Sequence, residues 1–159
     1  MSKNWLQYKD LVYWNTIPKI EKIKKNNNRY KWFPDGRLNV AFNCLIKNKN
    51  KKKDDKIALH LITKNLEIKN VTYAELRAYV EKFSHFLKKK LNNKKKISVI
   101  FLGPSSLESA IVMLSCSQLG INFSVIFDDL SIAAIKQRIK LVKCDFFITN
   151  NKNLNFKEI

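Results

Sequence analysis

The stretch ISVIFLGPSSLESAIVMLSCSQLGINFSVIF, residues 97–127, decides the fold of this chain. Residues 97–102 form a short apolar run with β-branched side chains, which is typical of a parallel strand buried on both faces. The Gly-Pro pair at 103–104 ends that strand, and a capping box at 105–108 then predicts a helix. Gly120 suits the left-handed position that commonly follows a helix. The stretch therefore predicts a strand, a helix and the beginning of a second strand.

The next segment repeats the same order of elements. Residues 121–127 predict a strand, and helically spaced apolar residues over 132–142 predict a helix capped by Ser131 or Asp129. Phe146–Thr149 predicts a third strand. We expect an α/β fold, a βαβαβ parallel sheet with right-handed crossovers and its ligand edge at the carboxyl ends of the strands. Those ends are residues 102–106, 127–131 and 149–153.

A hairpin and a long helix precede the parallel sheet. Residues 57–63 alternate like a strand, and residues 66–71 follow as its partner. The lone His60 within the first strand is expected to be structural or exposed. Thr72 and Glu75 form a capping box, which opens an amphipathic helix with lysines at its end.

The first 56 residues predict an irregular helical N-terminal extension. Residues 5–25 contain two short helical candidates, the second based on the spacing of Ile17, Ile20 and Ile23. A turn is expected at Pro34-Asp35-Gly36 within the segment 31–45, with Gly36 supplying a permissive backbone position. The Lys/Asn-rich segment 46–56 predicts a linker without fixed structure. We therefore expect an extension at 1–56 and a partial Rossmann-like α/β subdomain at 57–159.

The chain is strongly basic, with 31 lysines and arginines, 13 acidic residues and a net charge of +18. A nucleic-acid partner is one explanation. The excess is nearly all lysine, however, and it accompanies abundant asparagine and isoleucine. Compositional drift in an AT-rich genome explains that trio better. The three glycines, Gly36, Gly103 and Gly120, are too scattered to form a phosphate-binding loop.

The remaining composition excludes several classes of protein. Cys44, Cys116 and Cys144 are widely spaced and lie among apolar neighbours, so we expect buried free thiols and no zinc site. No apolar run reaches the about 18 residues of a membrane span, and the N-terminus lacks the apolar core of a signal peptide. These features predict a cytoplasmic protein without a membrane partner.

Four stretches of the chain share a resemblance to one family. KWFPDGRLNVAFNCL (31–45), VTYAEL (71–76), ESAIVMLSCSQLGINFSVIF (108–127) and RIKLVKCDFFIT (138–149) follow one another in order. Together they resemble the N-terminal portion of the acetyl-CoA synthetases, AMP-forming acyl-CoA synthetases of the adenylating superfamily. The resemblance covers roughly residues 5 to 155. It implies the incomplete N-terminal part of an adenylating-enzyme large domain.

The resemblance implies a reaction in which acetate, ATP and CoA give acetyl-CoA, AMP and diphosphate through acetyl-adenylate, with ATP, Mg²⁺ and CoA as cofactors. It also implies CoA-facing positions, in degraded form, at Phe127, Asp128, Asp129, Asn155 and Lys157. The family has Gly-Gly where this chain has its two aspartates, and carboxylates repel phosphate. The family's arginine in the helix before that segment is Gln118 here.

The family's ATP loop and catalytic lysine have no counterpart in this sequence. We therefore expect no catalytic residues and no cofactor on this chain alone, and we expect it to be inactive by itself. One alternative is a piece of a split synthetase, complemented by a separately encoded remainder. A second alternative is a basic nucleotide- or nucleic-acid-binding module. The expected partner is the remainder of the synthetase; CoA is doubtful and nucleic acid is disfavoured.

Overall fold

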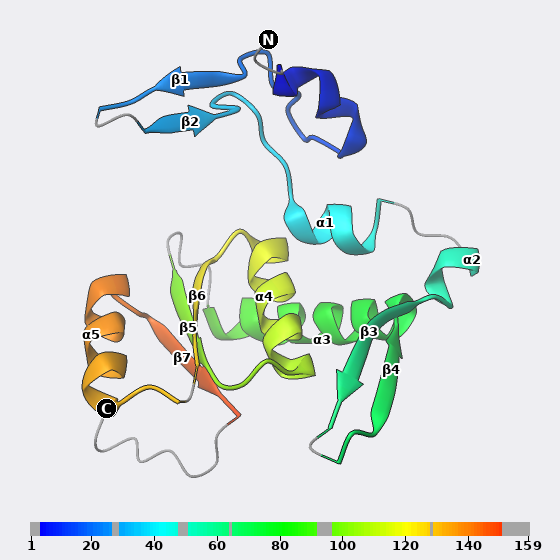
Figure 1. Cartoon of the computed structure of the whole chain (residues 1–159), viewed down its shortest axis with the longest axis vertical. Helices are drawn as coiled ribbons and strands as arrows, with labels where there is room; N and C mark the ends of the chain where they lie inside the picture. The colour runs from blue at the N-terminus through cyan, green and yellow to red at the C-terminus, as the bar shows by residue number, and fades with distance from the viewer. Residues whose placement is uncertain are drawn as a thin grey trace. The chain divides into compact units, whose positions relative to one another are not determined.

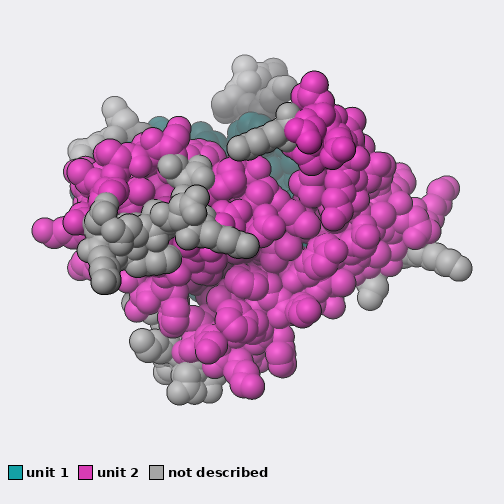
Figure 2. Space-filling model, turned by 90° about the horizontal axis from the view of Figure 1, so that it is seen from below, with its two compact units in different colours: residues 1–48 teal, residues 49–159 magenta. Residues whose placement is uncertain are grey.

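The computed structural model describes residues 4–26, 29–47, 51–63, 65–91, 97–127 and 129–150. The chain forms two compact units, residues 1–48 and 49–159, which Figure 2 distinguishes by colour. The border between the units lies inside the segment 46–56 that the sequence predicts as a linker. The proposed division at residue 56 stays a prediction.

The centre of the second unit is a three-stranded parallel sheet with the order β6-β5-β7 (Figure 1). The strands are β5 (Ser98–Leu102), β6 (Asn122–Ile126) and β7 (Phe146–Thr149). Leu102 pairs with Ile126 on one side and with Thr149 on the other, so all three strands end at the same edge. The predicted α/β fold with its βαβαβ order is confirmed.

Two helices follow the strands and cover opposite faces of the sheet. Helix α4 spans Leu107–Leu119 and α5 spans Ile132–Val142. On one face, Val99 and Phe101 pack with Val112 and Cys116 of α4. On the other face, Ile100 and Leu102 pack with Ile135 of α5. The central strand β5 is therefore buried on both sides, as its uninterrupted apolar sequence predicts.

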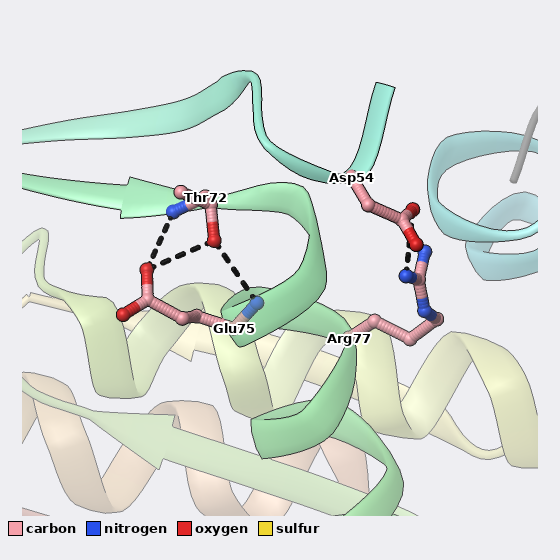
Figure 3. Close-up of polar contacts among 4 residues, drawn as sticks. All are labelled: Asp54, Thr72, Glu75 and Arg77. Carbon is pink, nitrogen blue, oxygen red and sulfur yellow. Dashed lines mark hydrogen bonds and ion pairs between the residues drawn. The ribbon is translucent and has the colours of Figure 1, made fainter. Parts of the chain in front are cut away.

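Helix α3 (Tyr73–Leu91) lies beside α4, where Leu87 and Leu91 join the same core. Its N-terminus carries the predicted capping box: the Glu75 N–H donates to the Thr72 hydroxyl, and the Glu75 carboxylate accepts from the Thr72 N–H at 2.8 Å (Figure 3). A buried hydroxyl joins the two helices, since Ser115 Oγ donates to the Val80 carbonyl at 3.1 Å.

The predicted hairpin is present as the antiparallel pair β3 (Ile57–Ile62) and β4 (Ile68–Thr72). His60 is exposed, and its Nδ1 lies 2.7 Å from the Asn70 side-chain oxygen on the facing strand. This cross-strand pair agrees with a structural role for His60.

A short helix, α2 (Lys51–Asp54), lies within the segment for which the sequence predicts no fixed structure. Its last residue explains the difference. The Asp54 carboxylate lies 2.7 Å from the guanidinium of Arg77 on α3, in a pair whose side chains are largely shielded from solvent (Figure 3). A tertiary ion pair thus orders a segment whose own composition favours solvation.

The capping of α4 differs from the prediction by one residue. Ser106, not Ser105, is the N-cap, and its box partner is Ser109 instead of Glu108. The Ser109 hydroxyl accepts from the Ser106 N–H at 3.0 Å, which is the kind of hydrogen bond expected from the Glu108 carboxylate. For α5, the structure selects Ser131 as the cap over Asp129.

The first unit contains a 3₁₀ helix, η1 (Trp5–Leu11), the hairpin strands β1 (Lys22–Lys24) and β2 (Tyr30–Trp32), and a short helix α1 (Val40–Leu45). The second predicted helix, over residues 17–25, is wrong. Its main chain pairs with the segment 29–37 instead, and the Asp35 carboxylate accepts from the N–H groups of Lys19 and Ile20. Tertiary hydrogen bonds here outweigh a weak local periodicity.

The turn predicted at residues 34–36 is confirmed, because the Gly36 N–H donates to the Phe33 carbonyl at 3.0 Å. The reason for its glycine is different from the one predicted. Phe33, with φ of 44°, has the left-handed backbone, whereas Gly36 has no positive φ. A Cβ at Gly36 would lie 2.8 Å from the Trp14 ring. Gly36 therefore provides space for an aromatic side chain.

Candidate functional site

The carboxyl edge of the parallel sheet is the candidate site. The chain leaves β5 for β6 on one side and then returns to β7 on the other side. The strand order therefore reverses between β5 and β7, and such a switch point is where open α/β sheets bind ligands.

Gly103 and Asn150 bring the loops after β5 and β7 into contact. The Gly103 N–H donates to the Ile126 carbonyl at 3.0 Å, which holds the loop against the end of β6. A Cβ on Gly103 would collide with the side-chain oxygen of Asn150 and would lie 3.1 Å from the Phe101 ring. Gly103 thus leaves room for this close approach at the switch point.

The helices that begin at this edge are capped by their own serines. At α4, the Ser106 hydroxyl accepts from the Ser109 N–H at 3.3 Å; at α5, the Ser131 hydroxyl accepts from the Ala134 N–H at 3.3 Å. Each cap uses one of the N–H groups that a phosphate would otherwise bind at a helix N-terminus.

The structure brings two of the five predicted site residues to this edge. Phe127 directly follows β6 and is 54% exposed, and Asp129 is also exposed. Asp128, Asn155 and Lys157 lie outside the described residues. The roles of all five stay predictions.

The described part of this edge offers no cationic side chain to a phosphate-bearing ligand such as CoA or ATP. Residues 103–106, 127, 129–131 and 150 include no lysine or arginine, and they include the carboxylate of Asp129. Phosphate binding relies on cations or on clustered backbone N–H groups. Within the described ranges, no group of three or more histidines, cysteines or acidic residues is placed to hold a metal ion.

Gln118 joins two helices, a role that the sequence does not predict. Its side-chain oxygen accepts from the Ser84 hydroxyl at 2.9 Å and so connects α4 to α3. The amphipathic pattern of each helix predicts an apolar face but does not predict which polar side chains will meet across the contact. Gln118 is therefore a packing residue in this chain.

An apolar groove of about 400 Å³ lies between α3 and β7. Aromatic and aliphatic side chains form most of its lining, with Lys90 as the charged residue. The lining residues are Phe83, Phe86, Leu87, Lys90, Phe146, Phe147, Ile148 and Thr149. The Lys90 ammonium lies 5.9 Å from the centre of the Phe86 ring. The groove lining contains no pair of titratable groups suited to acid–base chemistry.

Comparison with protein families gives a match to the model described as AMP-binding enzyme, over residues 46–158. Acetyl-coenzyme A synthetase of Helicobacter pylori (strain G27) is 30% identical over 166 residues, which cover 92% of this chain and 25% of that protein. Acetyl-coenzyme A synthetase of Herminiimonas arsenicoxydans is 32% identical and covers 93% of this chain and 23% of its own length. The chain thus spans about a quarter of the relatives it matches.

Among solved structures, acetoacetyl-CoA synthetase from Streptomyces lividans superposes with a TM-score of 0.75 at 20% identity. The superposition covers 90% of this chain and 22% of that protein. At this identity the superposition shows a shared fold. No helix in the described ranges combines the length and apolar character that crossing a membrane would require.

Proposed function

This chain belongs to the AMP-binding enzyme family, and from that membership we propose that it is the N-terminal part of an AMP-forming acetate–CoA ligase. The observation that carries the proposal is the match of more than nine-tenths of the chain to acetyl-coenzyme A synthetases. The reaction proposed for the whole enzyme joins acetate to CoA through acetyl-adenylate, with release of AMP and diphosphate. The proposed location is the cytoplasm.

We propose that the chain alone has no ligase activity. Adenylation requires the carboxylate and ATP to be held in line, with cations stabilising the transferring phosphorus. The sequence has no glycine-rich loop to cradle the phosphates, and the described sheet edge has an acidic residue and no basic one.

Acetate-dependent exchange of isotopic diphosphate into ATP tests this point. The purified chain should give no exchange above a blank without acetate, whereas acetyl-coenzyme A synthetase of Helicobacter pylori serves as the positive control. Acetate-dependent exchange by the chain alone would overturn the proposal of inactivity.

We propose that Phe127, Asp128, Asp129, Asn155 and Lys157 occupy the CoA-facing positions of the whole enzyme in a degraded form. Carboxylates facing phosphate weaken binding, and lysine does not reproduce a bidentate arginine. Calorimetric titration with CoA should show no binding to the chain. Saturable binding at micromolar CoA would contradict the degraded state of this site.

A second candidate function is complementation of a separately encoded remainder. The observation that favours it is the exposure of large apolar side chains near the β3–β4 turn: Ile62 is 67% exposed, Leu66 81% and Ile68 64%. Apolar clusters of this kind mark surfaces that another protein covers. Recovery of diphosphate exchange when a remainder is co-expressed with the chain would support complementation.

A further inference from the structure

We propose that one face of the β1–β2 hairpin, formed by Lys22, Lys24, Tyr30 and Trp32, is the surface by which this chain binds the rest of the synthetase. We call these four residues the ring face. The inference rests on the proposed function, because it takes the remaining three quarters of an acetate–CoA ligase as its partner.

The strand register places the four side chains together. Lys22 pairs directly with Trp32, and Lys24 pairs with Tyr30, so each pair shares a face of the hairpin. The Lys22 ammonium lies 5.1 Å from the centre of the Trp32 ring and 5.2 Å from that of Tyr30. The two rings are nevertheless 45% and 48% exposed. The hairpin is blue in Figure 1. Its ring face thus presents two large rings and two lysine side chains to solvent.

A two-stranded hairpin of this size is not stable in water unless it packs against something else. All six residues of β1 and β2 are exposed, so packing of their side chains contributes little to holding the hairpin together. Tryptophan and tyrosine are also among the residue types that are enriched at interface hot spots. The ring face therefore has the properties of a contact surface.

The hairpin is held in place at both of its ends. At the turn, the Lys25 N–H donates to the Arg29 carbonyl at 2.7 Å; at the open end, the Phe33 N–H donates to the Glu21 carbonyl at 2.8 Å. The Phe33 ring packs edge-on against Trp14, 5.5 Å between centres. The two hydrogen bonds close the hairpin at both ends, and the Phe33–Trp14 contact anchors its open end, so less chain entropy is lost on binding.

The length of the related proteins and the charge of the ring face indicate which partner binds there. The relatives that align with this hairpin and the rest of the chain are about four times as long, so most of a synthetase remains to cover its exposed surface. The ring face is basic, with two lysines beside the rings, and the chain has a net charge of +18. Because the ring face combines two aromatic rings with two lysines, the partner surface should have an apolar pocket for the rings and carboxylates at its border.

Co-expression tests the assignment. The tagged full chain is co-expressed with a probe, the acetyl-coenzyme A synthetase of Helicobacter pylori without the quarter that aligns with this chain. The probe is chosen so that adding back its own missing quarter restores its activity. The double variant Tyr30→Ala/Trp32→Ala should lower the co-purified probe by at least about tenfold, as expected for two interface hot spots. Trp5 on η1 is 51% exposed, slightly more than Trp32, and Trp5→Ala should change co-purification by less than about twofold.

A second set of variants tests the charge. Lys22→Gln should lower co-purification and weaken its dependence on salt, whereas Trp32→Phe, which keeps an aromatic ring, should retain most of the binding. Circular dichroism melting curves of all variants should coincide with that of the wild-type chain. A Tyr30→Ala/Trp32→Ala variant that binds the probe like the wild type would overturn the ring-face assignment and leave the proposed function intact.

Two further outcomes separate the hypotheses. A wild-type chain that does not bind the probe would overturn both complementation and the ring-face assignment, but not the family membership. The same variants are titrated against a fluorescent single-stranded oligonucleotide as a comparison. A steep, salt-dependent affinity lost with Tyr30 and Trp32, together with no binding to the probe, would overturn the proposal in favour of a nucleic-acid platform.

Discussion

At the residue scale, the three glycines of the chain have two kinds of physical reason: space at Gly36 and Gly103, and backbone conformation at Gly120. Gly36 leaves room for the Trp14 ring, and Gly103 leaves room for the Asn150 side chain. Gly120 has open space around its Cα but has a left-handed φ of 68°, as expected for a residue that ends a helix. Sequence spacing predicts the role of Gly120, whereas close approach by a distant side chain is not visible in the sequence.

Gly36→Ala should destabilise the chain by about 1–3 kcal/mol, because the new methyl group would force the Trp14 ring out of place. Urea unfolding followed by tryptophan fluorescence measures the loss. Gly120→Asn is the matched control and should cost less, since asparagine accepts a left-handed backbone and nothing lies near that position. Equal free energies of unfolding for Gly36→Ala and wild type would refute the steric role of Gly36.

The capping box of α3 should make stability depend on pH. The hydrogen bond from the Thr72 N–H lowers the pKa of Glu75 below its ordinary value of 4.5, and the hydrogen bond from the Thr72 hydroxyl adds a smaller effect in the same direction. Since the folded pKa is lower than the unfolded one, the ionised carboxylate stabilises the folded chain above about pH 4.5, and this contribution is lost as pH falls through the folded pKa. Unfolding midpoints of wild type and Glu75→Gln should therefore differ at pH 7 and converge below pH 4.5. A difference independent of pH would contradict this linkage.

At the element scale, prediction succeeded where an element carries its own signal. The apolar run at β5, the alternation in β3 and the Thr72–Glu75 box each depend on neighbours in sequence, and each element is present. Strand β1 and helix α2 were missed because their causes are distant in sequence. The first depends on pairing with β2, and the second on Arg77 of α3.

Asp54→Ala should destabilise the second unit by about 1–3 kcal/mol, because it leaves the shielded Arg77 guanidinium without its acidic partner. Urea unfolding gives the free energy, and hydrogen exchange should show faster exchange at α2. Asp55→Ala removes the neighbouring exposed carboxylate and should change stability by less than about 0.5 kcal/mol. Identical effects of the two variants would show that net charge, not the ion pair, is responsible.

At the scale of the whole molecule, the succession of strands and helices and the parallel direction of the strands follow from the sequence, and so does the edge where the strands end. The spatial order β6-β5-β7 comes from the structure alone. The chemistry of that edge does not. The contact of Gly103 with Asn150 and the serine caps depend on side-chain placement across loops, which no local pattern encodes. Phe127 and Asp129 are at the predicted edge, and a ligand role for them stays a prediction.

Cysteine labelling should report global opening of the second unit. Cys116 is fully buried in the core shared by α3, α4 and β5, and burial raises its pKa to about 11. Cys44 is exposed, so the prediction that it is a buried thiol is wrong. At pH 8 a thiol reagent should modify Cys44 rapidly and Cys116 only as fast as the unit unfolds. Mass spectrometry of labelled peptides across a urea series measures both rates. Rapid labelling of Cys116 without urea would contradict a closed core.

The double-sided burial of β5 has a consequence for synthesis of the chain on the ribosome. Val99, Ile100, Phe101 and Leu102 are each at most 1% exposed once both α4 and α5 are in place. When the nascent chain has left the ribosome only as far as Leu119, α4 can cover one face of β5, but α5, which covers the other face, has not yet emerged. Until α5 emerges, the uncovered side is a short apolar, β-prone segment of the kind that chaperones bind and aggregates recruit. Translation rate across residues 120–142 should therefore influence the yield of folded protein.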